Sequence, residues 1–175
     1  MKLEVEVMGL ENKEKLKQFI HYLIYLTQNR EEVGKTVLYK MMYFSEFDFY
    51  ELYEEMLTGE LYRKIPMGPA PVHFDEALEE LEREEKIRYF KNKYGRYEQF
   101  RFESLREPDT SLLNRSERNV IEADVEKLSG MNATEMTQYS HADMPCKASK
   151  DGEIIDYELV FYRHPPYSVR EYEDD

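Results

Sequence analysis

One stretch, Gly34 to Val72, constrains the fold more than any other part of the chain. Two neighbouring lines of apolar residues run along its first half with the period of an α-helix. A helix with so wide an apolar surface has to be covered by several neighbours. We therefore expect a central helix over residues 34–57, ended at Thr58-Gly59 because glycine adopts the left-handed conformation without steric cost. The two lines are Leu38, Met42, Phe49, Leu52 and Met56, and Val37, Met41 and Phe44.

Asp48 continues the second apolar line, so it is predicted to be partly buried. A buried carboxylate needs hydrogen-bond donors or a basic partner. One interpretation leaves Asp48 at the edge of the stripe, bonded to nearby backbone or to water. The other makes it an anchor between the helix and the turns at Thr58-Gly59 or Gly68-Pro69. Both are structural rather than catalytic.

Hydrophobic periodicity and turn residues predict the remaining elements. Alternation indicates strands, and Asn, Ser and Thr before an apolar face indicate helix starts. A segment over 154–162 fits either a strand or a short helix. The others are a strand over 2–8, a helix over 12–28, a turn or strand over 61–65, a loop at Gly68-Pro69 and Pro71 that opens a helix over 72–85, a β-hairpin over 86–102 with its turn at 91–95, a helix from Asn114 or Ser116 to 128, a short helix or turn over 132–139 with Thr134 available to cap it, and a polar loop over 140–150.

Together these elements predict an α+β fold that is mainly α-helical. We expect a single domain over residues 1–162, with about five to six helices and a small antiparallel β-hairpin or sheet. Two prolines and a run of acids mark residues 163–175 as a loose acidic C-terminal tail.

Composition favours a cytoplasmic protein that binds other proteins. The chain has 175 residues and a net charge of −13, which opposes nonspecific binding to nucleic acids or anionic membranes. A single cysteine, Cys146, allows no internal disulfide and fits a reducing compartment. The N-terminus lacks a signal pattern, and no apolar run approaches the roughly 18 residues of a membrane span.

The sequence has no motif of a nucleophile elbow, a phosphate loop or a dinucleotide fold, so we expect no enzyme activity and no cofactor. His141, Asp143 and Cys146 supply only half of the paired spacing of a structural zinc site, so we expect no metal. The many glutamates between Glu76 and Glu85 are interpreted as a solvated helix face.

The predicted hairpin differs from the rest of the chain in charge. Between Lys86 and Arg106 seven basic residues face two acids, a local charge of +5, and aromatic residues are interleaved with them. Three interpretations remain: a basic sheet face that balances the acidic helix before it, a docking site for an acidic protein, and a surface for nucleic acid. The order helix, helix, basic hairpin is also that of a winged helix, so the alternative function is a winged-helix-like DNA-binding regulator using hairpin 86–106.

The chain resembles the SocA-like antitoxin or Panacea domain family over about residues 16–162. The family pattern places lysines, aromatics and an acid on a helix, followed by an apolar-Thr-Gly turn, a basic link and Gly-Pro. The family commonly has a tryptophan after a later Ser-His and Pro, where this chain has Cys146. The matching residues are Lys35, Leu38, Lys40, Tyr43, Phe44, Glu46 and Phe47, then Leu57-Thr58-Gly59, Leu61, Tyr62 and Met67-Gly68-Pro69, with Ser140-His141 and Pro145 later in the chain.

The resemblance implies the antitoxin of a prokaryotic or phage toxin–antitoxin system, which neutralises a cognate toxin protein by direct binding. Some members of the family deliver the toxin to a protease, so protease machinery is a further expected partner. The oligomeric state stays open. The candidate partner-contact residues are Tyr62, Arg63, Lys64, Tyr89, Lys93, Tyr94, Arg96 and His141, and the motif residues expected to be structural are Lys40, Tyr43, Phe44, Asp48, Thr58, Gly59, Gly68 and Pro69.

Overall fold

The structure is a computed structural model that describes residues 10–173, so the strand predicted over 2–8 lies outside the described residues. The described part is α+β and mainly helical, as predicted. It contains α1 (Leu10–Thr27), α2 (Lys35–Tyr53), β1 (Tyr62–Ile65), β2 (Gly68–Pro71), α3 (Phe74–Arg83), β3 (Ile87–Tyr94), β4 (Tyr97–Ser104), α4 (Arg115–Leu128), α5 (Ala133–Ala142), α6 (Met144–Ala148) and the 3-10 helix η1 (Tyr157–Tyr162).

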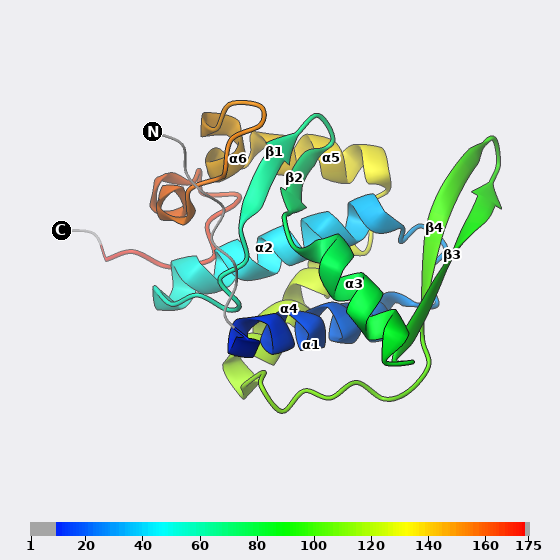
Figure 1. Ribbon diagram of the computed structural model, residues 1–175. Helices are drawn as coiled ribbons and strands as arrows, with labels where there is room; N and C mark the ends of the chain where they lie inside the picture. The colour runs from blue at the N-terminus through cyan, green and yellow to red at the C-terminus, as the bar shows by residue number, and fades with distance from the viewer. Residues whose placement is uncertain (1–9, 174–175) are drawn as a thin grey trace.

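Helix α2 is the centre of the molecule, which confirms the predicted central helix. Every residue from Met41 to Phe49 is buried. Figure 1 shows α2 crossing the middle of the molecule, with α1 and α4 on one side and the β1–β2 hairpin and α5 on the other. The η1 helix packs near its C-terminal end. A helix covered from so many directions places polar side chains, as well as apolar ones, inside the protein.

Helix α2 ends four residues earlier than the sequence indicates. Glu54 takes the left-handed conformation with φ 55° and donates its N–H to Tyr50 O, which closes the helix. Gly59 also has a positive φ of 77° but lies in the following turn rather than at the helix end. The glycine rule therefore identified a left-handed turn but not the one that ends α2.

The prediction of a loop at Gly68-Pro69 and Pro71 is wrong, because these residues form strand β2. It pairs antiparallel with β1 through Ile65↔Gly68 and Tyr62↔Pro71. With a two-residue turn between the strands, hydrogen-bonded pairs alternate from Ile65↔Gly68 onward. Both prolines then fall at the intervening positions, where no N–H is needed within the hairpin.

The second hairpin, β3–β4, confirms the prediction over 86–102 but places its turn later. Tyr94 pairs with Tyr97, so the turn consists of Gly95 and Arg96, with Gly95 at φ 62°. A two-residue hairpin turn needs positive φ, which glycine supplies. The predicted turn at 91–95 is therefore wrong, and both strands are longer than expected.

The C-terminal half is more helical than predicted. Asn114 caps α4 through a reciprocal capping box with Glu117. Of the two predicted helix starts, Asn114 and Ser116, the first is therefore confirmed. Helix α5 is capped in the same way by Asn132 and Glu135, not by Thr134. The predicted polar loop over 140–150 instead contains the end of α5 and all of α6. Residues 157–162 form a 3-10 helix capped by Asp156. Most of the segment 154–162, which fitted either a strand or a short helix, is therefore helical.

Candidate partner interface

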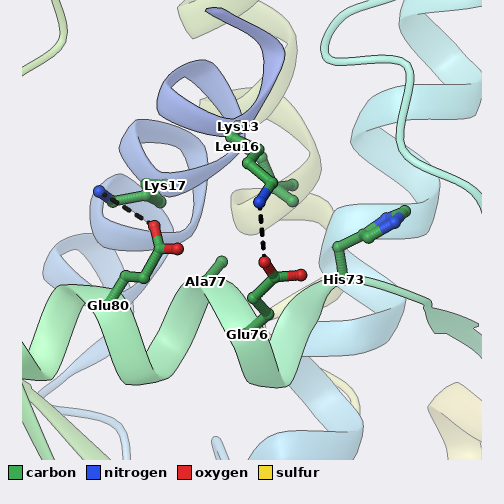
Figure 2. A pocket seen from close by; sticks show the side chains of 7 residues that line it. All are labelled: Lys13, Leu16, Lys17, His73, Glu76, Ala77 and Glu80. Atoms are coloured by element: carbon green, nitrogen blue, oxygen red, sulfur yellow. Dashed lines mark hydrogen bonds and ion pairs between the residues drawn. The ribbon is translucent and has the colours of Figure 1, made fainter. Parts of the chain in front are cut away.

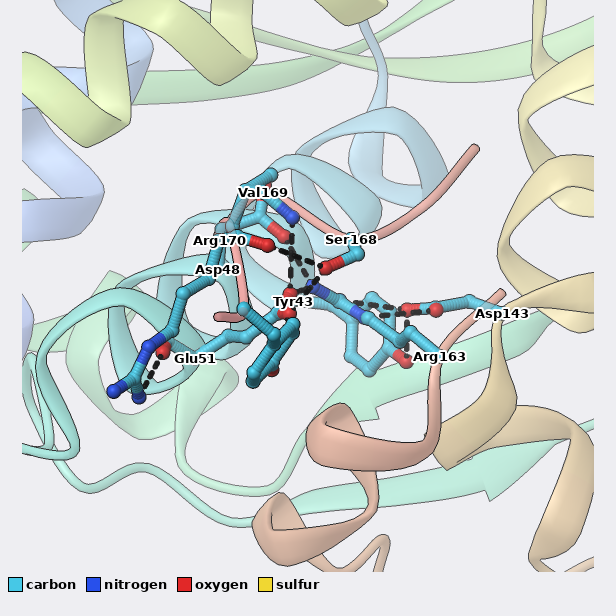
Figure 3. Close-up of polar contacts among 9 residues, drawn as sticks. Tyr43, Asp48, Glu51, Asp143, Arg163, Ser168, Val169 and Arg170 are labelled. Atoms are coloured by element: carbon cyan, nitrogen blue, oxygen red, sulfur yellow. Dashed lines mark hydrogen bonds and ion pairs between the residues drawn. The ribbon is translucent and has the colours of Figure 1, made fainter. Parts of the chain in front are cut away.

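A buried cluster of charges lies beside the middle of α2, with Arg163 at its centre (Figure 3). The guanidinium donates from Nη1 to Asp48 Oδ1 at 2.7 Å and to Glu51 Oε1 at 3.0 Å. Its Nε and Nη2 donate to the two carboxylate oxygens of Asp143 at 2.9 and 2.8 Å. The side chains of Arg163, Glu51 and Asp143 are completely buried. One arginine therefore joins α2 to the start of α6.

Further buried groups extend the cluster. Tyr43 donates its hydroxyl to Asp143 Oδ2 at 2.8 Å. Burial raises the pKa of Asp48, while Arg163 acts in the opposite direction. Burial together with the charge of Asp48 raises the pKa of Asp124 well above its usual value. The carboxylates that Arg163 contacts are therefore hydrogen-bonded, whereas Asp124 Oδ2 is buried without a hydrogen-bond partner among the described residues.

The segment after η1 lies against α2 through Glu51. Ser168 Oγ and Tyr172 Oη donate to Glu51 Oε2 at 2.6 and 2.8 Å, and the Val169 N–H donates to Glu51 Oε1 at 3.1 Å. Arg170 Nη1 also donates to the Glu51 carbonyl at 3.2 Å. This differs from the loose tail expected from Arg163 onward. The segment is held by polar bonds to one buried carboxylate, which prolines and terminal acids do not reveal.

The anchoring contacts expected of Asp48 are made by two other residues of α2. Glu46 accepts bonds from the N–H and hydroxyl of Thr58, and burial raises the pKa of Glu46 to about 7. Lys40 donates to Met67 O beside Gly68, and burial lowers its pKa to about 8. Asp48 instead pairs with Arg163, so both earlier interpretations of Asp48 are wrong.

The other motif residues lie in the same core. Phe44 packs against the ring of Tyr139 with centroids 5.1 Å apart, and Pro69 is buried. Gly68 has φ 115°, and a Cβ there would lie 3.0 Å from both Lys40 Cε and Ser140 Oγ. Lysine, glycine and serine therefore meet at a point that admits no larger residue.

Four predicted contact residues lie at or near the β1–β2 hairpin, and three of them bond to backbone carbonyls elsewhere in the chain. Tyr62 is completely buried, so it does not belong to the surface. Arg63 Nη1 donates to Gly152 O at 2.8 Å, and Lys64 Nζ donates to Ser149 O at 2.9 Å. His141 Nε2 lies 3.1 Å from Pro66 O. These side chains hold the hairpin to α5 and to the loop after α6.

The predicted contact residues in the second hairpin are placed differently. Lys93 and Arg96 are exposed near its tip, and among the described residues neither has a carboxylate within salt-bridge distance. Tyr89 is half-buried against Phe102 on the neighbouring strand. Tyr94 is the last residue of β3, beside the turn. The structure thus brings these four residues together on one hairpin and separates them from the β1–β2 group.

One face of this hairpin is hollowed. The hollow has a volume of about 340 Å³ and includes Phe90, whose side chain is 40% exposed. Glu31, from the loop between α1 and α2, closes one side of it. Its remaining lining residues are Asn92, Lys93, Gln99, Arg101 and Glu103.

Lysines of α1, by contrast, form ion pairs with acidic residues of the same chain. Figure 2 shows Lys13 and Lys17 pointing from α1 to Glu76 and Glu80 on α3, with nitrogen–oxygen distances of 2.8 and 3.4 Å. The space between these side chains is only about 10 Å³, room for a single water. Of the six glutamates between Glu76 and Glu85, only Glu80 is half-buried and the others are exposed, so the predicted solvated acidic face is largely present.

The loop residues weighed as metal ligands have other roles. Asp143 is bound by Arg163 and Tyr43, as described above. Cys146 is buried, and burial raises the pKa of its thiol to about 11, so the thiol is protonated at neutral pH. Between residues 10 and 173, the helices include none that is both long and apolar enough to span a membrane.

These observations define a small, mainly helical α+β domain whose motif residues build its core. A comparison with known protein families identifies the family of this domain: the model of the antitoxin SocA-like, Panacea domain matches residues 38–146. The chain belongs to this family. Searches of curated proteins and of solved structures found no match to this chain.

Three residues that matter most in the core were not predicted from the sequence, namely Glu46 as an anchor, Glu51 and Arg163. Glu46 and Glu51 lie on the wide face of α2 beside buried aromatics, which was an available signal. No signal in the sequence indicated a role for Arg163, because this residue follows the last predicted element by one residue.

Proposed function

We propose that this protein is the antitoxin of a two-gene system and neutralises its toxin by direct binding at the β3–β4 hairpin. Membership of the SocA-like antitoxin family supports the general role. The observation that carries the choice of surface is the clustering of seven basic residues against two acids in 86–106, with Lys93 and Arg96 exposed and, within the part of the chain that is described, unpaired at the hairpin tip.

A hairpin of this charge fits an acidic protein surface. The segment 86–106 carries +5 in a chain of −13, so the remainder carries −18. A partner with an acidic patch is attracted to the hairpin and repelled elsewhere, which fixes its orientation and speeds association. Phe90, exposed beside the hollow, offers an apolar contact at the centre of this surface.

The neighbouring helix favours a protein partner over DNA. In a winged-helix arrangement α3 would precede the hairpin as the recognition helix. Its exposed residues include Asp75, Glu76 and Glu79, which would face the phosphate backbone with like charge. The winged-helix alternative therefore lacks the basic helix that it needs.

Co-expression tests the proposal. The reading frame adjacent to this gene is expressed alone and together with the antitoxin, and growth and co-purification are measured. We expect growth arrest by the neighbour alone, rescue by this protein, and a stable complex. Rescue without a complex would contradict direct neutralisation. A toxin half-life that shortens only when this protein is present would instead favour delivery to a protease.

A matched pair of variants tests the surface. Lys93→Glu with Arg96→Glu reverses two charges on the hairpin, and Arg115→Glu with Lys147→Glu reverses two exposed charges on α4 and α6. We expect the first pair to lose rescue and the second to retain it. Equal rescue by both pairs would show that the toxin binds elsewhere.

A further inference from the structure

Strand β3 has an edge that no other described strand covers. The β3–β4 sheet has two strands, and the two-residue turn makes Tyr94↔Tyr97 a hydrogen-bonded pair. Pairing alternates from there, so the N–H and C=O groups of Tyr89 and Lys91 point away from β4. Outside the hairpin, neither residue's backbone bonds to the backbone of another described residue.

The opposite edge is covered at its base. Ser104, at the end of β4, donates its N–H to Gln28 Oε1 at 2.9 Å. Arg101 reaches the same loop, donating from Nη1 to Arg30 O at 2.6 Å. The side chain of Gln99 packs against Gly34, where a Cβ would lie 2.9 Å from Gln99 Cγ. The loop between α1 and α2 therefore covers part of β4, and the outer edge of β3 remains accessible to a partner.

Exposure confirms this difference between the strands. On β3, every residue from Arg88 to Lys93 is exposed except Tyr89, which is half-buried. On β4, every residue from Gln99 to Glu103 is half-buried or buried, and Glu98 is exposed. Figure 1 shows the hairpin standing at the side of the body beyond the ends of α2 and α3. A partner strand therefore has access along the outer half of β3.

The charge of β3 selects the strand that would pair with it. Between Ile87 and Tyr94 the strand has three basic residues and no acid. Arg88 and Lys91 pair with Glu103 and Glu98 of β4, at 2.6 and 3.8 Å, and Lys93 has no carboxylate partner among the described residues. Lysines on an edge disfavour pairing with a neutral strand or with a second basic one, and opposite charges across a strand pair stabilise it. Two copies of this chain joined through β3 would place lysines against lysines, so a second copy is disfavoured.

We propose that the edge of β3 from Tyr89 to Lys93 binds an extended acidic segment of the partner toxin as a third strand of the sheet. The proposal rests on the proposed function and adds the mode of binding to it. Backbone hydrogen bonds to Tyr89 and Lys91 would supply affinity for any extended segment. The charge of Lys93, which is unpaired among the described residues, would select an acidic one, and the hollow beside Phe90 would receive a side chain from it.

Amide hydrogen exchange tests the edge directly and requires no variant. The antitoxin is measured alone and in complex with the purified product of the adjacent toxic reading frame. We expect exchange at Lys91 and Tyr89 to slow by roughly tenfold or more in the complex, with no comparable change at Glu98 on the other edge. A complex that forms without slower exchange at Lys91 and Tyr89 would overturn the strand proposal and leave the proposed function standing. Absence of any complex would overturn both.

Proline substitution separates backbone pairing from charge. Lys91→Pro removes one outward donor and the charge, while Lys91→Gln removes only the charge. Glu98→Pro is the matched control on β4, since Glu98 also occupies an outward-facing register position. We expect Lys91→Pro to raise the Kd for the toxin roughly tenfold beyond Lys91→Gln, with Glu98→Pro close to wild type. Equal Kd values for Lys91→Pro and Lys91→Gln would contradict strand addition.

Discussion

Two regions of this protein are rich in charge, and they use it in opposite ways. Around α2, Arg163 is completely buried and each carboxylate that it contacts has a fixed partner. At the β3–β4 hairpin, the cations at the tip are exposed and, among the described residues, unpaired. Buried charges specify how the chain packs, whereas exposed charges are free to attract a partner. The family motif lies mainly in the first region, so its residues report the fold more than the binding surface.

The largest effect is expected from removing the arginine at the centre of the buried cluster. Arg163→Met leaves the carboxylates of Asp48, Glu51 and Asp143 without their cation, which costs about 3–5 kcal/mol for a broken buried pair. Urea denaturation measures the loss. Arg88→Met is the matched control, because its side chain is 60% exposed where it pairs with Glu103 on the β3–β4 hairpin, and surface pairs contribute about 1 kcal/mol or less. Similar losses in both variants would contradict the distinction between the regions.

The next effect concerns pH. Burial raises the pKa of Glu46 to about 7 from 4.5, so the folded state holds this proton more tightly than the unfolded state. The resulting stabilisation is complete below about pH 4.5 and is lost as pH rises through 7, a change of about 3 kcal/mol at 1.36 kcal/mol per pKa unit.

Glu46→Gln removes this titration. Compared with the variant, the wild type should lose up to about 3 kcal/mol of unfolding free energy between pH 4.5 and pH 8. Denaturation series at several pH values measure the difference. Parallel pH curves for the two proteins would show that Glu46 titrates near its ordinary pKa.

A smaller effect is expected where Lys40 and Ser140 surround Gly68. Gly68→Ala places a Cβ 3.0 Å from Lys40 Cε in a backbone conformation with φ 115°, which costs roughly 1–3 kcal/mol. Gly130→Ala is the control, because no atom lies within 4 Å of the added Cβ and its φ is not in the left-handed region. Thermal denaturation compares the two, and an unchanged melting temperature for Gly68→Ala would show that the site can relax.

The smallest effect on stability is expected at the hairpin tip. Lys93→Glu with Arg96→Glu should change the free energy of unfolding by only about 0.5 kcal/mol or less, because both side chains are exposed. Urea denaturation checks this. A loss of several kcal/mol would mean that these charges stabilise the fold, and the contrast between the two regions would disappear.

The sequence predicted those parts of the fold that depend on local pattern. The central helix, the second hairpin and the Asn114 cap all follow from periodicity and from turn or capping residues close in the chain. The buried cluster does not, because Arg163 and Asp48 are 115 residues apart and no local pattern relates them. Asp48 was therefore recognised as buried, but its partner was not.

The exposure of the residues predicted to contact a partner was predicted only in part, for the same reason. The excess of basic residues in 86–106 is a local property of the sequence, and the exposure of Lys93 and Arg96 agrees with it. The basic residues Arg63 and Lys64 looked equally available, but their carbonyl partners come from residues 149–152, far along the chain. Whether a cation is free depends on tertiary contacts, which composition does not contain.

The most direct test of the proposed contact is a calorimetric titration of the purified toxin into three proteins whose stabilities are first compared by urea denaturation. These are the wild type, Lys93→Glu with Arg96→Glu, and Arg115→Glu with Lys147→Glu. We predict that the hairpin variant binds with a Kd raised roughly tenfold or more at low salt, while the control pair stays within about threefold of wild type. Equal weakening in both variants, or none in either, would contradict the claim that the free charges of the hairpin bind the partner.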